Sequence, residues 1–193
     1  MVQSGGILSK RSKLTLALAL LFIGGCASHP LIDAAVSGDT PTVIALLNNG
    51  ADVNVTQGDA GMTPILCASV WGHAEVVQAL LARGAKVNDK DSVGVTALMD
   101  ASSAGHLDVV RVLLMNGAEI NARDHWGNTA LMYASIGGHL EVMQLLLAMG
   151  ADANARSTRS TGLAPKGTTA LFLALKSGHM DAAQLLRDRG GQE

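Results

Sequence analysis

A stripe of apolar residues recurs along the chain with the spacing i, i+1, i+4 and i+5. It is formed by Val76, Val77, Leu80 and Leu81, then by Val109, Val110, Leu113 and Leu114, then by Val142, Met143, Leu146 and Leu147. This spacing is typical of a helix that is buried along one side. A shorter apolar run precedes each stripe and begins after a threonine, which can cap the start of a helix. The pattern therefore predicts consecutive pairs of short helices.

These helix pairs return at a fixed distance. Three columns of residues are each spaced by 33 positions: Thr63, Thr96 and Thr129; His73, His106 and His139; Gly84, Gly117 and Gly150. A fixed period of this size is the signature of stacked supersecondary units, each of which covers the apolar face of its neighbour. The periodicity predicts an all-α solenoid.

The most legible unit begins at Asp91. It reads D-S-V-G-V-T-A-L-M-D-A, then G-H, V-V-R-V-L-L, G-A and Asn121. This unit resembles an ankyrin repeat, whose family pattern reads D-x-x-G-x-T-P-L-H-x-A-A, G-H, V-V-x-L-L-L and G-A-D-V-N. The resemblance implies a solenoid of about five helix-turn-helix repeats. Their predicted ranges are 29–56, 57–90, 91–123, 124–156 and 157–193.

The chain departs from the family pattern in three places. The His of T-P-L-H is replaced by apolar residues, so the hydrogen bonding of that side chain is not implied for this chain. The first repeat lacks the D-x-x-G turn, as suits a terminal cap. In the last repeat Thr169 follows Thr129 by 40 residues, which places a seven-residue insertion within 157–167. Its second helix is less apolar, and we expect Leu186 to be less buried than Leu113.

The N-terminal segment has the order of a secretory signal. An apolar run over 14–23 follows three basic residues, and its ten residues are too few to span a bilayer as a helix. It ends in Ile-Gly-Gly-Cys26, which resembles the bacterial lipobox. The resemblance implies that residues 1–25 are cleaved as a signal peptide, that Cys26 is lipidated, and that 26–28 form a short tether. An ordinary signal peptide with a chance Cys, or an uncut anchor, are the alternatives.

If the lipobox prediction holds, it sets the location and the state of the second cysteine. Ala27 follows the lipidated Cys where Asp would favour retention in the inner membrane, so the predicted place is the periplasmic face of the outer membrane. Lipidation of Cys26 leaves Cys67 without a disulfide partner. We expect Cys67 to be a small buried residue within a helix.

Composition and charge narrow the function classes. Apolar residues make up 48% of the chain and aromatic residues only 3%, which suits closely packed small helices. Residues 27–155 hold 5 basic and 13 acidic residues. A surface this acidic is poorly suited to nucleic acid, because affinity for nucleic acid depends on neutralising phosphates.

The recurring histidines invite a metal hypothesis, but geometry disfavours it. Packed helices lie about 8–10 Å apart, whereas Zn–N bonds are about 2.0–2.1 Å long, so one metal cannot take ligands from three successive repeats. No phosphate loop, nucleophile elbow or metalloprotease motif is present, and no cofactor is predicted. An enzyme or metal carrier using His125, Asp100 and Cys67 stays as a competing hypothesis. It requires these side chains to converge within about 3–4 Å.

The ankyrin resemblance implies a protein partner, bound by the hairpin fingertips and the outward positions of the first helices. Apolar residues and both tryptophans fall in these columns, as is usual at interfaces. The predicted contact residues are Trp71, Trp126, Val70, His125, Asp100, Tyr133, Ile136, Met62, Val93 and Val95. The alternative is that the two tryptophans merely cover neighbouring repeats.

We therefore predict a membrane-tethered periplasmic lipoprotein that is not an enzyme and binds an unidentified envelope or periplasmic protein. The competing hypothesis within binding proteins is an immunity or inhibitor protein that occludes an envelope enzyme or toxin.

Overall fold

The structure is a computed structural model that describes residues 29–160 and 164–193. Within these residues ten helices follow one another as five pairs. They are α2 (Pro30–Ser37) and α3 (Thr40–Asn48), α4 (Pro64–Val70) and α5 (Ala74–Leu81), α6 (Ala97–Ala104) and α7 (Leu107–Met115), α8 (Ala130–Gly137) and α9 (Leu140–Ala148), α10 (Ala170–Ser177) and α11 (Met180–Asp188).

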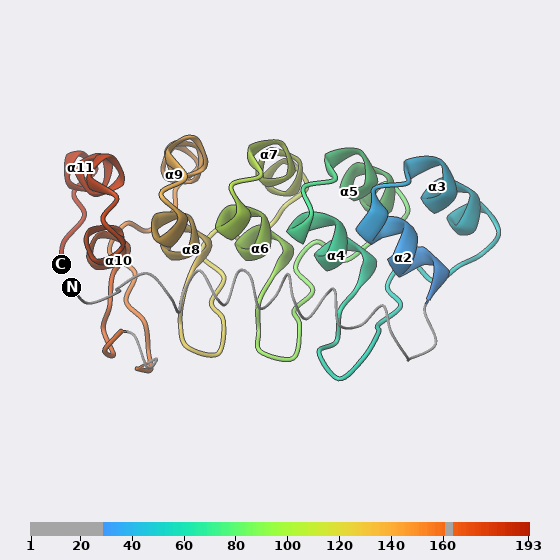
Figure 1. Cartoon of the computed structure of the whole chain (residues 1–193), viewed down its shortest axis with the longest axis horizontal. Coiled ribbons are helices and arrows are strands. Elements are labelled where there is room, and N and C mark those ends of the chain that lie inside the picture. The colour runs from blue at the N-terminus through green and yellow to red at the C-terminus, as the bar shows by residue number, and fades with distance from the viewer. Residues whose placement is uncertain (1–28, 161–163) are drawn as a thin grey trace, which may run out of the picture.

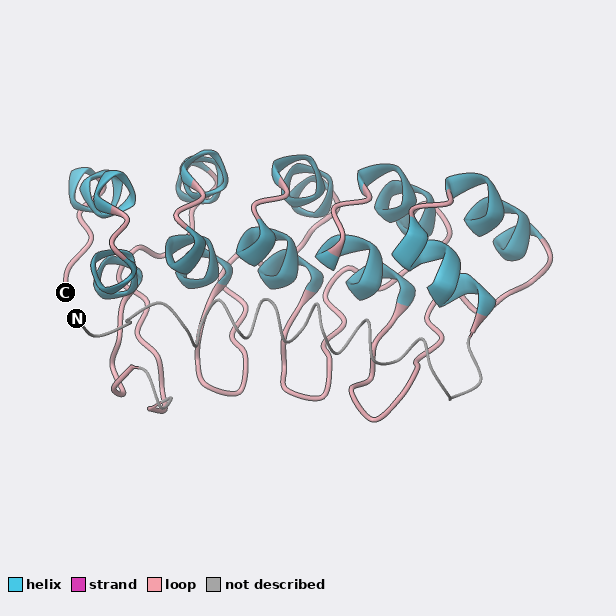
Figure 2. Cartoon of the chain, in the orientation of Figure 1, coloured by secondary structure: helices cyan, strands magenta, loops and turns pink. Residues whose placement is uncertain are grey.

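The pairs stack side by side into an elongated solenoid. The first helices of the pairs form one row, the second helices form another, and the connecting hairpins project below the first row (Figure 1). Each first helix contacts the first helix of the next pair, from α2 through α10. Figure 2 shows helices and loops but no strand in the described residues. The predicted all-α solenoid is confirmed.

Local sequence signals explain where the helices begin and end. Thr63, Thr96, Thr129 and Thr169 each have an extended backbone, and their side chains accept a hydrogen bond from the backbone N–H three residues ahead. This satisfies one of the donors that a helix start leaves unpaired. Gly105 follows the last residue of α6, and its φ of 78° is left-handed and therefore favours glycine.

The core is one continuous apolar column between the two rows of helices. It runs from Leu31 in α2 to Leu186 in α11, and the repeated stripes supply its largest side chains. Leu186 is as fully buried as Leu113, at 0% exposure. The expectation that the last repeat buries this leucine less is wrong, because α11 packs against α9 and α10 and places Leu186 in the same core cluster as Leu113. The backbone N–H of Gly191 donates to the Leu186 carbonyl at 2.8 Å, as the Ala118 N–H donates to the Leu113 carbonyl in repeat 3.

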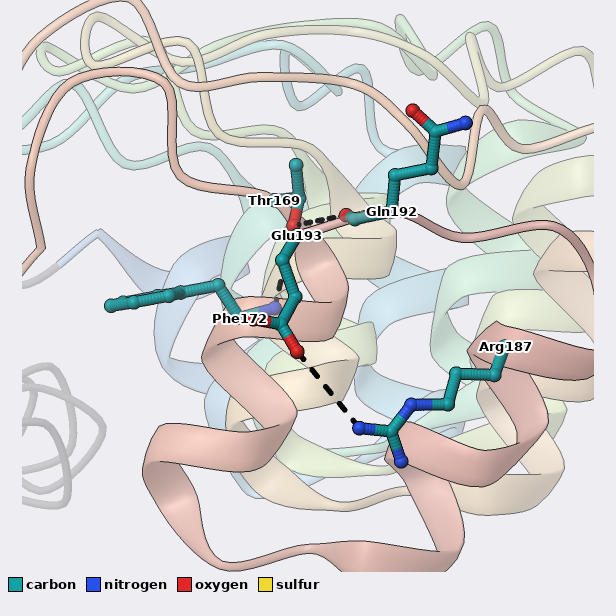
Figure 3. A network of polar contacts seen from close by, with 5 residues as sticks. All are labelled: Thr169, Phe172, Arg187, Gln192 and Glu193. Atoms are coloured by element: carbon teal, nitrogen blue, oxygen red, sulfur yellow. Dashed lines mark hydrogen bonds and ion pairs between the residues drawn. The ribbon is translucent and has the colours of Figure 1, made fainter.

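The C-terminal tail takes the place of a further repeat. Thr169 Oγ1 donates to the Gln192 carbonyl at 2.8 Å, and the Glu193 carboxylate lies 3.9 Å from the Arg187 guanidinium (Figure 3). The Gln192 N–H donates to the Asn154 side chain at 2.8 Å. The same asparagine clamp joins earlier repeats, since the Asp152 N–H donates to Asn121 Oδ1 at 2.9 Å. The tail therefore caps the stack with bonds that the other repeats use between themselves.

The histidine column forms a second set of links between repeats. His73, His106, His139 and His179 each place Nε2 3.0–3.1 Å from a carbonyl oxygen in the first helix of the preceding pair. Each ring also packs on a glycine of that pair. A Cβ added to Gly72 would lie 2.6 Å from the His106 ring, so only glycine fits there. The imidazoles therefore lie at the turns between the paired helices and link consecutive repeats.

No helix in the described part of the chain is both long enough and apolar enough to cross a bilayer. The predicted signal peptide and the lipidation at Cys26 lie outside the described residues.

Candidate protein-binding surface

The fingertip hairpins and the outward residues of α4, α6 and α8 together form one side of the solenoid, which we call the front surface. Neighbouring hairpins are joined by backbone hydrogen bonds, which fixes their spacing. The Ser92 N–H donates to Ala60 O at 2.9 Å, and the His125 N–H donates to Val93 O at 3.1 Å. The front surface is therefore one connected platform (Figure 1).

Both tryptophans lie on this platform and are partly exposed. Trp71 directly follows α4 and caps its C-terminal end. Trp126 lies in the hairpin before α8, where its N–H donates to Asp124 Oδ1 at 2.8 Å and its carbonyl accepts from the Thr158 N–H at 2.8 Å. These two hydrogen bonds fix the backbone of Trp126 and thereby the position from which its indole projects.

The base of this hairpin is a satisfied polar network. The carboxylate of Asp124 is buried and accepts from the Asn128 N–H, from the Asn128 amide and from the Tyr133 hydroxyl, the last at 2.7 Å. Burial raises the pKa of Tyr133, and the charge of Asp124 adds to this effect. Tyr133 therefore stays protonated at neutral pH and acts as a hydrogen-bond donor.

Titratable residues occupy the same position of four successive first helices: Asp33, Cys67, Asp100 and Tyr133. Burial raises the pKa of Cys67 to about 12, with smaller contributions from the charges of Asp100 and Asp33. Burial also raises the pKa of Asp100 well above its usual value, and the charge of Asp91 adds to the shift. The surroundings of Cys67, Asp100 and Tyr133 therefore destabilise the negatively charged forms of these side chains.

The whole described solenoid matches one family. A family model of ankyrin repeats (3 copies) matches residues 31–124 and 121–193. The chain belongs to the ankyrin-repeat family. No curated protein matches it. Ankyrin repeats serve as interaction modules, and the family thus indicates a protein partner for this ankyrin-repeat chain.

The structure places the predicted contact residues of this ankyrin-repeat protein in three environments. Trp71, Trp126, Val93 and Asp100 are partly exposed, and His125 is exposed. A second group is also partly exposed but packs against the core cluster: Met62, Val95, Tyr133 and Ile136.

Val70 differs from the other predicted contact residues because its side chain is only 8% exposed. It is the last residue of α4, which packs between α2 and α6. The inclusion of Val70 among the contact residues is wrong for this reason. What Val70 contributes is its carbonyl, which accepts from His106 Nε2.

The residues of the competing enzyme hypothesis have different surroundings in this ankyrin-repeat protein. His125 is exposed on a hairpin, whereas Cys67 is buried within α4. A thiol with a pKa of about 12 is not a nucleophile at neutral pH. Within residues 29–160 and 164–193, no three His, Cys, Asp or Glu side chains gather as a metal ion would require.

Sequence reasoning missed the carboxylates at the base of the hairpins. Asp91 and Asp124 are the first residues of the D-x-x-G turns, and each accepts two backbone N–H groups of its own hairpin. The signal that could have found them is spacing, because each stands nine residues before a titratable residue of the next helix, Asp100 or Tyr133. The large apolar side chains with the highest exposure lie off the front surface, at Met115, Met149 and Met180.

Proposed function

We propose that this ankyrin-repeat protein is a lipoprotein of the bacterial envelope that binds a partner protein through the front surface of repeats 2–4. The observation that carries the proposal is the position of the chain's two tryptophans. Both are partly exposed on this one surface, two repeats apart. Interfaces are enriched in tryptophan, and such anchors commonly dominate the binding energy.

The rigidity of the platform supports the same proposal. The hairpins are tied to one another by backbone hydrogen bonds, and the helices behind them are tied by the histidine and asparagine links. A preorganised surface loses little conformational entropy when a partner binds. The front surface therefore has the construction of a binding face.

The envelope location rests on the N-terminal sequence. A basic segment, an apolar run of ten residues and Cys26 follow one another in the order of a lipoprotein signal. α2 begins at Pro30, so only three residues separate Cys26 from the first helix. Lipidation would hold the first repeat next to the bilayer, and the partner would then be a protein of the periplasm or of the same membrane.

A photocrosslinking amino acid at position 71 or 126 tests the proposal in intact cells. We expect one defined adduct from both positions, which mass spectrometry can identify. The matched control is position 144, an exposed glutamine of α9 in the outer row of helices. An equal yield of the same adduct from position 144, or no adduct from either tryptophan position, would contradict the proposed binding face.

A further inference from the structure

The solenoid ends at α10 and α11, and no further helix covers this pair in the part of the chain that the structure describes (Figure 1). In the pairs before it, each helix contacts the matching helix of the next pair. The C-terminal tail bonds to Thr169, which precedes α10. The remaining surface of the last pair has the form that a helix pair covers elsewhere in the same molecule. We call this surface the end face, and its residues are Phe172, Leu175, Lys176, Gly178 and Arg187.

Phe172 holds a position that every earlier repeat buries. The equivalent side chains are at most 5% exposed and belong to Ile32, Leu66, Met99 and Met132. Phe172 is partly exposed and lies outside the core cluster. Figure 3 shows its ring pointing away from Arg187 and Gln192. This aromatic ring therefore contributes to the surface of the solenoid and not to its core.

Leu175 adds apolar surface three residues after Phe172. Its position holds small residues in the earlier repeats, and all of them are fully buried: Ala35, Ser69, Ser102 and Ser135. Leu175 is larger and is partly exposed. Residues three positions apart are neighbours on the surface of a helix, so Phe172 and Leu175 form one apolar pair on α10.

The opposite end of the solenoid is polar at positions that later repeats bury. Asp33 and Thr42 are exposed, whereas the equivalent Cys67 and Val76 of the second repeat are buried. A polar outer face is what a terminal repeat needs in order to stay in contact with water. α10 departs from this rule, and its apolar pair favours a partner that covers the end face.

The glycine of the end face is uncovered as well. A Cβ added to the equivalent glycines would meet the histidine ring of the next repeat at 2.5–2.6 Å, and these glycines are Gly38, Gly72, Gly105 and Gly138. Gly178 holds the same position, and within the described residues nothing lies within 4 Å of its added Cβ. The end face therefore offers an open place for a side chain of a docked helix.

Positive charge accompanies the apolar pair. Lys176 stands where the preceding repeat has Ile136, and its Nζ lies 5.8 Å from the centre of the Phe172 ring, within the range of a cation–π interaction. Arg187 stands where the preceding repeat has Leu147, and its side chain is 47% exposed. Its guanidinium lies 3.9 Å from the Glu193 carboxylate, so a carboxylate can approach it.

This charge differs in sign from the rest of the solenoid. Residues 156–193 hold 6 basic and 3 acidic residues, whereas residues 27–155 hold 5 basic and 13 acidic residues. An acidic segment is therefore attracted to the last repeat and repelled by the others, and such complementarity directs a partner to one surface. A second copy of the chain would oppose the same cations at its own end face.

We propose that the end face binds an acidic amphipathic helix of a partner protein. The apolar side of this helix packs on Phe172 and Leu175, and its carboxylates pair with Lys176 and Arg187. The inference goes beyond the proposed function and does not depend on it, because the end face is separate from the front surface that holds Trp71.

A peptide titration followed by ¹⁹F NMR tests the end face directly. Full-length protein in nanodiscs of zwitterionic phosphatidylcholine carries 4-fluorophenylalanine, and Phe172 is one of 2 phenylalanines in the chain. Its signal is assigned by its loss in Phe172→Leu. The probe is an acetylated and amidated peptide of about 14 residues, near the shortest length at which an isolated helix forms. Its leucines form one stripe that glutamates flank, and lysines replace these glutamates in the control peptide.

We expect the glutamate peptide to shift the Phe172 signal and to bind at least about tenfold more tightly than the lysine peptide, the change that one charged hydrogen bond supplies. Lys176→Glu should weaken the glutamate peptide by a similar factor. Lys86→Glu makes the same charge change at an exposed lysine of repeat 2 and should leave the affinity unchanged. Phe172→Ser should weaken the glutamate peptide without lowering the urea midpoint, because the ring lies outside the core cluster.

Equal affinity for the two peptides, or an unchanged preference in Lys176→Glu, would overturn the proposal. So would a shift of the Phe172 signal in nanodiscs of anionic phosphatidylglycerol without peptide, which would assign the end face to a membrane surface. A shift that grows with protein concentration alone would assign it to a second copy of the chain and overturn the proposal too. Crosslinking from positions 71 and 126 reports on the front surface, so the proposed function succeeds or fails independently of these results.

Discussion

The imidazole of His106 lies 3.1 Å from the carbonyl oxygen of Val70 and thereby ties α7 to the end of α4 in the preceding repeat. A carbonyl only accepts, so Nε2 carries the proton and donates it. His73, His139 and His179 make the same bond across the other joints between repeats. In a linear stack each repeat contacts only its neighbours, so the stability of the solenoid depends on the interfaces between repeats. The histidine hydrogen bonds stabilise these interfaces.

Acidification should weaken the joint at His106. Burial lowers the pKa of His106 below its usual 6.5, while the bond to Val70 opposes the shift and the neighbouring His139 and His73 add to it. Between the two pKa values the unfolded chain binds a proton at His106 that the folded chain does not bind. The contribution of His106 to the free energy of unfolding is therefore fully present above pH 6.5 and is lost as the pH falls through its folded pKa. Urea unfolding at pH 7.5 and pH 5.5 measures the loss.

The variant His106→Gln separates this joint from the rest of the chain. It should cost about 0.5–1.5 kcal/mol at pH 7.5, the usual net value of one hydrogen bond, and it should reduce the loss on acidification. A variant that loses as much stability as the wild type between the two pH values would contradict the role of His106.

Truncation of core leucines should destabilise the middle and the end of the solenoid to a similar extent. Leu113 and Leu186 are both fully buried, and large-to-small changes at such sites cost about 2–5 kcal/mol. We expect Leu113→Ala and Leu186→Ala to fall in this range in chemical denaturation. Leu185, on the same helix as Leu186, is partly buried, and Leu185→Ala serves as the milder control. A loss at Leu186 no larger than at Leu185 would contradict the full burial of Leu186 in the core.

Removal of the Asp100 charge should stabilise the protein at neutral pH. The pKa of Asp100 is raised in the folded state, so this group's contribution is fully present below the unfolded pKa of about 3.9 and is lost as the pH rises through the folded value. Asp100→Asn is expected to unfold at a higher denaturant concentration than wild type at pH 7 and to lose this advantage at low pH. An unchanged or lower midpoint at pH 7 would contradict the raised pKa of this carboxyl group.

The fold was predictable from the sequence because its signals are local and repeated. Thr96 and Gly105 mark the start and the end of α6 by backbone rules alone, and the apolar stripe around Leu113 defines the buried side of α7. Leu186 was misjudged because its burial depends on how α11 packs against α9 and α10. The less apolar composition of that helix does not reveal this packing.

The candidate binding surface was predictable only as a set of equivalent positions in successive repeats. Position in the repeat placed Trp71, Trp126 and His125 on exposed or partly exposed sites. It failed for Val70, because the exposure of this residue depends on how tightly α4 packs between its neighbours. The hydrogen bond between Tyr133 and Asp124 required the structure, since hydrogen bonding depends on which side chains face each other.

Substitution of the predicted lipidation site should separate the protein from the membrane. Cys26→Ser removes the thiol that both acylation and processing need, so the chain should become soluble or persist at precursor size. Acyl chains contribute about 0.8 kcal/mol per buried CH₂ group, which makes the change visible in membrane fractionation. Cys67→Ser provides the control, since Cys67 is buried within α4. Wild-type size and wild-type membrane association of Cys26→Ser would refute the lipoprotein prediction.

Truncation of either tryptophan should abolish binding and leave folding nearly intact. Trp71 and Trp126 lie two repeats apart, roughly 20 Å at about 10 Å per packed helix, so a partner segment can contact both across repeat 3. Interface anchors of this kind commonly contribute 2 kcal/mol or more, about a thirtyfold change in affinity. Both side chains are partly exposed, and we expect Trp71→Ala and Trp126→Ala to shift the circular-dichroism melt by only a few degrees. The readout is the yield of the adduct from the crosslinker at the other tryptophan position, with Met115→Ala as the control for an exposed apolar residue off the front surface. Early unfolding of a variant would assign that tryptophan to packing between repeats. A wild-type adduct yield from both variants would move the proposed binding face to the inserted segment 157–167, which contains Arg159 and Lys166.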